Sequence, residues 1–213
     1  MTEQQTPPAE EQGLRSLPRN VWATSLTSFL TDASSEMVLN VFPLYLQALG
    51  IGTAAIGLIE GVADSIASLL KVFSGWFSDK VQGRKWLAVA GYGISTLAKP
   101  FFYLARTAPI AAVVRWAERV GKGVRTAPRD ALVADSIDES QRGLAFGFHR
   151  AADTGGAVLG LVIALVAVWL TQGESVDMIP TFKTLVLISL IPAFLAVVTL
   201  ALGARDVPIT RQR

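Results

Sequence analysis

The sequence contains no cysteine, and this absence excludes disulfide bonds and thiolate metal sites. Histidine occurs once, at His149, and a lone histidine is more typical of a satisfied side chain at an interface than of a metal ligand. No spacing typical of metal ligands is present, and no nucleophile is paired with a base. We therefore expect no enzyme activity, no cofactor, no metal and no nucleic-acid partner.

Long hydrophilic stretches are also scarce beyond the first twenty residues. Apolar residues make up 51% of the 213-residue chain and the mean hydropathy is +0.44, which is too high for an ordinary soluble domain. Because about 20 helical residues cross the bilayer core, six spans would use nearly everything after residue 20. Residues 1–20 are rich in Glu, Gln and Pro, so we expect a disordered cytoplasmic tail without a cleavable signal peptide.

Six apolar stretches lie between clusters of turn-forming residues. They cover residues 21–49, 53–78, 86–106, 109–134, 143–171 and 181–203. The sequence therefore predicts an all-α membrane protein with one six-helix transmembrane domain, residues 21–203. Residues 204–213 are expected to form a second cytoplasmic tail.

Basic residues gather on one side of the predicted bundle. The N-terminus, the even-numbered loops and the C-terminus hold twelve of the nineteen: Arg15, Arg19, Lys80, Arg84, Lys85, Arg125, Arg129, Arg142, Arg150, Arg205, Arg211 and Arg213. The opposite side holds only Arg106 and Lys183. By the positive-inside rule, we expect both termini in the cytoplasm and a multi-pass protein of the cell (inner) membrane.

The predicted spans carry many charged residues, although one at the bilayer centre costs about 2.5–3.5 kcal/mol. Helical periodicity sorts these residues into stripes along one face of each helix. The stripes hold Asp32 and Glu36; Glu60, Asp64 and Lys71; Arg115, Glu118, Arg119, Lys122, Arg125 and Arg129; and Arg150 with Asp153. Each stripe must pair with another or face water.

Two interpretations of the stripes remain open: charge networks that hold the bundle together, and a water-filled path. We expect the path to include Asp32, Glu36, Glu60, Asp64, Arg115, Arg119, Lys122 and Asp153. Six bases oppose six acids near the midplane, so the sequence does not indicate the charge of a substrate. An acid left unpaired in a low dielectric is suited to bind a proton, which makes protons a candidate coupling ion.

The segment from Gly75 to Lys85 reads Gly-Trp-Phe-Ser-Asp-Lys-Val-Gln-Gly-Arg-Lys and joins the second and third predicted spans. In place and spacing it resembles the signature loop of the major facilitator superfamily, although Gln82 stands where the family usually has glycine. The resemblance implies a cytoplasmic gating loop. Its residues here are Gly75, Asp79, Lys80, Arg84 and Lys85.

Two further features resemble the same family. Arg115 and Gly121 are similar to its fourth-span motif, with Arg119 in place of one glycine, and Gly155 to Gly160 resemble its fifth-span glycine motif. The resemblance implies the N-terminal six-helix half of a permease, with the first, second, fourth and fifth spans beside the transport path. It also implies lipid and a small-molecule substrate as partners.

Family members normally have twelve spans, with substrate bound between two six-helix halves. Three interpretations of this single half stay open. It is a half-transporter that pairs with itself as a homodimer or with a second six-helix half, a truncated transporter that is inactive alone, or a non-transporting membrane scaffold. Transport by alternating access is the favoured function.

Overall fold

A computed structural model describes residues 13–80, 83–171 and 178–207. Every regular element in these ranges is a helix, in agreement with the all-α prediction. Most of the expected N-terminal tail, Gln82 of the expected gating loop, most of the connection before the last span and the end of the C-terminal tail lie outside the described residues.

Seven α-helices account for most of the described chain. They are α1 (Arg19–Leu39), α2 (Phe42–Ala48), α3 (Thr53–Lys80), α4 (Arg84–Ala98), α5 (Ala108–Asp135), α6 (Arg142–Thr171) and α7 (Met178–Gly203). Short 3-10 helices cover Leu14–Ser16, Lys99–Leu104 and Glu139–Gln141. The predicted second, fourth, fifth and sixth spans correspond to α3, α5, α6 and α7, whereas the first and third are interrupted.

The first predicted span breaks between α1 and α2 because of Pro43. Proline has no N–H to donate to the carbonyl four residues earlier, and its ring clashes with that carbonyl. Here that carbonyl belongs to Leu39, which is where α1 ends. The helix resumes at Phe42, with Pro43 in the first turn of α2.

The third predicted span changes its helix type for the same reason. Pro100 cannot bond to the carbonyl of Thr96, and α4 ends at Ala98. The Lys99 N–H bonds to the Thr96 carbonyl instead, and the chain continues as the 3-10 helix Lys99–Leu104.

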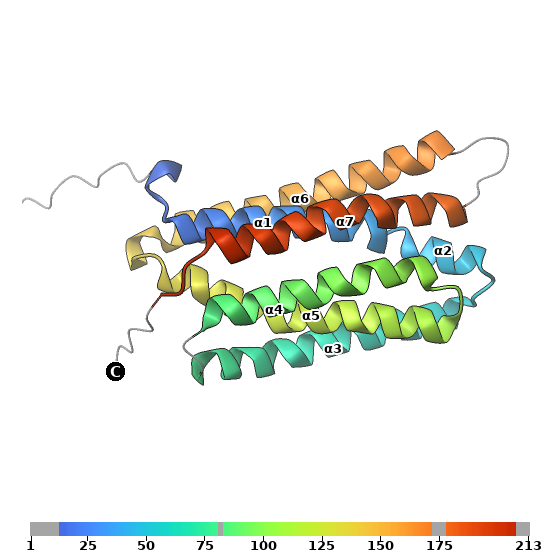
Figure 1. Ribbon diagram of the computed structural model, residues 1–213, viewed down its shortest axis with the longest axis horizontal. Coiled ribbons are helices and arrows are strands. Elements are labelled where there is room, and N and C mark those ends of the chain that lie inside the picture. Colours follow the sequence, from blue (N-terminus) through green and yellow to red (C-terminus); the bar gives the residue numbers. More distant parts are fainter. Residues whose placement is uncertain (1–12, 81–82, 172–177, 208–213) are drawn as a thin grey trace, which may run out of the picture.

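The long helices form two layers (Figure 1). Helix α1 packs against α6 and α7 in one layer, and α5 packs against α3 and α4 in the other. The layers meet where α4 contacts α7. Each layer therefore combines helices from the first and second halves of the chain, and α1 and α5 each contact both other helices of their layer.

Glycines bring α6 close to α1. A Cβ on Gly156 would overlap the carbonyl oxygen of Phe29, and one on Gly160 would lie 2.5 Å from the carbonyl oxygen of Ala33. A Cβ on Gly155 would make only an ordinary contact, 3.6 Å from the Phe29 ring. The close packing predicted for this glycine motif is thus present at Gly156 and Gly160, where it brings two backbones together.

Two described helices, Glu139–Thr171 and Met178–Gly203, are long and apolar enough to cross a membrane by length and composition. Among the other long helices, α4 has only 15 residues, α3 and α5 carry more charged residues, and α1 carries Asp32, Glu36 and many small polar side chains. The count of six spans therefore stays a prediction, whereas the helical architecture is confirmed.

Candidate functional site

Two adjoining hollows form the candidate site, which we call the polar cavity. One hollow, of about 470 Å³, is lined by Asp64, Ala67, Ser68, Lys71, Arg119, Lys122 and Thr126. The other, of about 290 Å³, is lined by Asp32, Lys122, Arg125, Thr126, Arg129, Arg150, Asp153, Thr154 and Ala157. Lys122 and Thr126 belong to both linings, so these two residues of α5 mark the junction of the hollows.

The lining comes from α1, α3, α5 and α6. These helices correspond to the first, second, fourth and fifth predicted spans, which the family resemblance places beside a transport path. Helix α5 supplies a side chain to the cavity at Arg119, Lys122, Thr126 and Arg129. Spacings of three and four residues keep these side chains on one face of the helix.

The most buried charge cluster lies outside this lining, around Arg115. Arg115 Nε donates to both carboxylate oxygens of Glu60 at 3.0 Å, and its Nη2 donates to Glu60 Oε2 at 2.6 Å. Its Nη1 donates to Glu118 Oε2 at 2.8 Å. Arg115 is 2% exposed and Glu118 is 1% exposed. We call these three residues the compensated cluster, because both carboxylates pair with Arg115, and Glu118 Oε2 also lies 3.9 Å from Nε of Arg119.

Two ion pairs lie within the polar cavity. Arg119 Nη2 is 3.2 Å from Asp64 Oδ1 across α5 and α3. Arg129 Nη2 is 2.9 Å from Asp130 Oδ1, and its Nη1 is 3.8 Å from Asp153 Oδ1. The contact between Arg129 and Asp153 links α5 with α6. Together with the pair of Arg119 and Asp64, it connects α5 to the cavity walls formed by α3 and α6.

Four lining residues have no such partner. Within the described ranges, the side chains of Asp32, Lys71, Lys122 and Arg150 form no hydrogen bond and no ion pair. Arg125 is 4% exposed, and its Nη1 donates to the neutral hydroxyl of Ser95 at 2.6 Å. The cavity therefore holds charged groups that water or a ligand must solvate.

Five of the eight predicted path residues line the polar cavity: Asp32, Asp64, Arg119, Lys122 and Asp153. Glu60 and Arg115 lie in the compensated cluster instead. Glu36 lies outside both groups, where its Oε2 accepts a hydrogen bond of 2.6 Å from Asn40 Nδ2. Periodicity places all eight on polar stripes, but it does not show which stripe meets which.

The sequence-based selection omits four cations that line the cavity: Lys71, Arg125, Arg129 and Arg150. Helical spacing could have identified them as lining residues, because Lys71 continues the stripe of Asp64 at a spacing of seven residues. Arg125 and Arg129 likewise continue the stripe of Arg119. Arg150 lies three residues before Asp153 on the same face of α6.

The residues of the predicted gating loop are spread over several contacts. Arg84 forms ion pairs with Asp135 and, at 3.4 Å, with Asp79. The Lys85 N–H donates to Asp206 Oδ1 at 2.9 Å. Lys80 Nζ lies 3.6 Å from the centroid of the Trp76 ring. These contacts join the ends of α3, α4 and α5 to the segment after α7.

Gly75 contributes less to this region than its motif suggests. A Cβ at Gly75 would lie 3.4 Å from the Cβ of Ala127, which is an ordinary contact. The close approach between α3 and α5 occurs at Gly123, where an added Cβ would lie 2.6 Å from the Cβ of Leu70.

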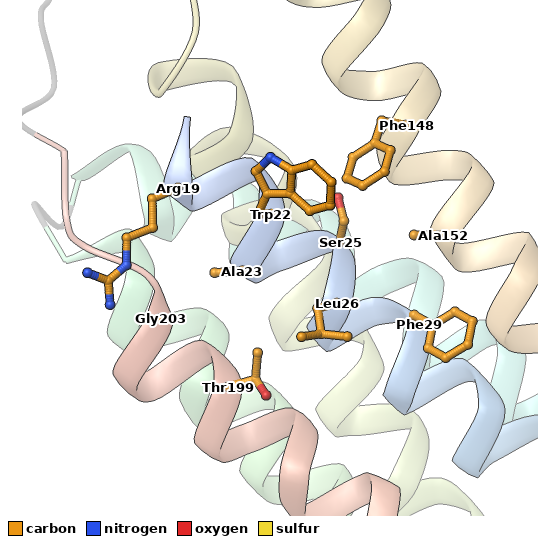
Figure 2. A pocket seen from close by; sticks show the side chains of 10 residues that line it. All are labelled: Arg19, Trp22, Ala23, Ser25, Leu26, Phe29, Phe148, Ala152, Thr199 and Gly203. Carbon is orange, nitrogen blue, oxygen red and sulfur yellow. The ribbon is translucent and has the colours of Figure 1, made fainter. Parts of the chain in front are cut away.

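A separate apolar hollow of about 560 Å³ lies between α1, α6 and α7 (Figure 2). Figure 2 shows the rings of Trp22 and Phe148 side by side at its edge, with centroids 4.5 Å apart. Arg19, its only charged lining residue, points away and donates to the Leu202 carbonyl at 3.0 Å. This hollow offers a surface for apolar groups and no polar recognition.

His149 lies beside the polar cavity. Its Nδ1 is 3.3 Å from Ser25 Oγ, and its Nε2 is 3.7 Å from Asp153 Oδ1. Among the described residues, no group of three or more histidine and acidic side chains is arranged to hold a metal ion.

Comparisons with known proteins agree with these features. The sequence profile of the Major Facilitator Superfamily matches residues 24–213. An uncharacterized MFS-type transporter of Methanocaldococcus jannaschii is 37% identical over 186 residues, which are 87% of this chain and 45% of that protein. An uncharacterized protein of Mycobacterium tuberculosis is 30% identical over 67% of this chain and 35% of its own length.

A multidrug resistance protein, MdtH of Blochmanniella pennsylvanica, is 29% identical over 62% of this chain and 32% of its own length. This chain thus spans less than half the length of these relatives. The matched region nevertheless includes all of α2 to α7 and all of α1 except its first five residues. The chain belongs to the major facilitator superfamily.

Proposed function

We propose that residues 21–203 form one half of the path of a secondary transporter for a small water-soluble solute, with the polar cavity as the solute-binding half-site. The observation that carries the proposal is the set of unpartnered charged side chains in a hollow lined by α1, α3, α5 and α6. Buried networks that only hold helices together are expected to be compensated, as the cluster around Arg115 is.

A second six-helix bundle completes the path in this proposal. Substrate binds near the bilayer midplane between the two halves of such transporters, and the halves are related by an axis along the membrane normal. The second bundle is either another copy of this chain or a separate half. The distribution of basic residues supports a multi-pass protein of the inner membrane with both termini in the cytoplasm.

Proton coupling is the second element of the proposal, and Asp32 is its candidate carrier. Asp32 lines the cavity and forms no ion pair with another described residue. A carboxylate in that position exchanges a proton without breaking an existing ion pair.

Uptake into proteoliposomes tests the proposal. Vesicles containing the 213-residue chain are incubated with an extract of water-soluble metabolites, and the retained solutes are quantified by mass spectrometry. We expect one solute class to accumulate, and we expect Arg119→Gln and Asp32→Asn to abolish this accumulation without preventing insertion.

The control variant is Arg142→Gln, which removes a 56% exposed cation outside the cavity and should leave uptake unchanged. A mass measurement in detergent identifies two copies as the complete unit if the active species is a dimer. Equal uptake by the wild type, both cavity variants and empty vesicles contradicts the proposal.

A further inference from the structure

The charges that line the polar cavity do not balance. Six lining residues are basic and three are acidic. The bases are Lys71, Arg119, Lys122, Arg125, Arg129 and Arg150, and the acids are Asp32, Asp64 and Asp153. The equal count along the sequence includes Glu36, Glu60 and Glu118, none of which lines the cavity, because Glu60 and Glu118 bind Arg115 and Glu36 lies at Asn40. Among the bases, Arg125 and Arg129 of the lining take the places of Lys99 and Arg115.

When the paired residues are set aside, the ratio of bases to acids in the lining is larger still. Asp64 lies against Arg119, and Asp153 lies against Arg129, which also contacts Asp130 outside the lining. Asp32 is then the remaining acid among the lining residues. Four cations of the lining remain outside these pairs: Lys71, Lys122, Arg125 and Arg150.

Arg125 contributes positive charge and forms no ion pair with a described carboxylate. Its guanidinium lies 4.7 Å from the centroid of the Tyr92 ring and donates to the Ser95 hydroxyl, and both partners are neutral. Electrostatic interactions are stronger in a low dielectric than in water, so this buried charge acts on a ligand in the adjoining hollow. Aromatic and hydroxyl contacts fix its position without cancelling its charge.

The remaining cations come from three helices. Lys122 of α5 lies at the junction of the hollows, Lys71 of α3 lines one hollow, and Arg150 of α6 lines the other. All three residues are exposed. A ligand that occupies both hollows therefore meets ammonium and guanidinium donors that are not committed to other groups.

We propose that the polar cavity binds a small anion through Lys122, with Lys71 and Arg150 on either side, so that the solute carried is a carboxylate or a phosphate compound. This inference rests on the proposed function and adds the class of solute. Lysine and arginine both form short charge-assisted hydrogen bonds to anionic oxygens, and arginine does so in a bidentate manner. Hollows of this size suit a small solute.

Thermal unfolding of the full chain in detergent, without added lipid, tests the proposal. The probes are inorganic phosphate and succinate as anions, putrescine as a cation and glucose as a neutral solute. We expect phosphate or succinate to raise the melting temperature in a saturable manner, and putrescine and glucose to leave it unchanged, because ligands that bind the folded state stabilise it.

The variants are Lys122→Gln and the matched control Lys183→Gln. Lys183 lies on α7 outside the polar cavity, with Nζ 5.1 Å from the Tyr103 ring centroid. Losing one charge-assisted hydrogen bond should weaken anion binding about tenfold in Lys122→Gln. Lys183→Gln should bind as the wild type does.

Three results would overturn the anion proposal: stabilisation by putrescine or glucose that Lys122→Gln abolishes, no stabilisation by either anion, or equal weakening in both variants. Displacement of phosphate by short-chain phosphatidylglycerol would assign the site to a lipid headgroup and would also overturn it. Failure here leaves the proposed function intact if proteoliposomes still accumulate a neutral or cationic solute. Anion binding without any accumulation contradicts the proposed function and leaves only the anion-binding site.

Discussion

Helix α5 carries two charged regions that differ in how their charges are matched. Toward its N-terminal half, Arg115 contacts Glu60 and Glu118 in a compensated cluster in which Arg115 and Glu118 are fully buried. One to two turns later, Lys122 lies in the polar cavity without a described partner. The difference indicates that charge within a predicted span has two uses, and that pairing across helices distinguishes them.

The largest expected effect comes from breaking the compensated cluster. Arg115→Leu leaves the buried carboxylate of Glu118 without its closest cation, which should cost about 3–5 kcal/mol of unfolding free energy. Reversible unfolding in mixed micelles with increasing sodium dodecyl sulfate measures this loss.

Lys122→Leu is the matched control for that experiment, because it removes a cation from the same helix. It should change the unfolding free energy by no more than about 0.5 kcal/mol, since Lys122 has no described partner. Equal destabilisation by the two variants would contradict the distinction between the compensated cluster and the polar cavity.

A smaller effect is expected where α6 forms a wall of the polar cavity. Gly156→Ala places a Cβ against the Phe29 carbonyl and should cost about 1–3 kcal/mol through overpacking. Gly155→Ala is the control one residue away, where the added methyl makes an ordinary contact and should be nearly neutral. The same unfolding titration measures both variants, and a neutral Gly156→Ala would mean that α6 does not approach α1 this closely.

Apart from the control variants, the smallest effect should come from the ion pair at the rim of the cavity. The Asp64 side chain is 69% exposed, and its oxygen lies 3.2 Å from Arg119. Solvent screens such a pair, so Asp64→Asn should cost less than about 1 kcal/mol. A loss comparable to that of Arg115→Leu would place Asp64 with the compensated cluster.

Hydropathy and periodicity predicted α3, α5, α6 and α7 as continuous helices and a charged face for α3, α5 and α6. Periodicity places Asp64 and Lys71 on one face of α3, and Lys122 and Arg129 on one face of α5. It does not reveal that Glu60 rather than Asp64 meets Arg115, because that choice depends on the rotation and crossing of two packed helices. The division into a cluster and a cavity is therefore a tertiary property.

Two predicted spans are interrupted at prolines, and a hydropathy profile does not reveal these interruptions. Pro43 and Pro100 both lie in apolar stretches, so the stretches appear continuous in hydropathy. Each proline ends an α-helix because it cannot bond to the carbonyl four residues earlier. Proline chemistry alone does not predict which spans break, because α5 and α7 continue through Pro128 and Pro192.

The absence of cysteine allows a direct test of whether water fills the polar cavity, because the chain already serves as a cysteine-free background. Ser68 and Leu69 are adjacent on α3 and both are exposed, but Ser68 lines the polar cavity and Leu69 does not. Single Ser68→Cys and Leu69→Cys variants in proteoliposomes are treated with a charged, membrane-impermeant methanethiosulfonate reagent. We expect the charged reagent to modify Ser68→Cys alone, with Leu69→Cys reacting only with a lipophilic maleimide. Equal reactivity of the two variants toward the charged reagent would contradict a water-filled path.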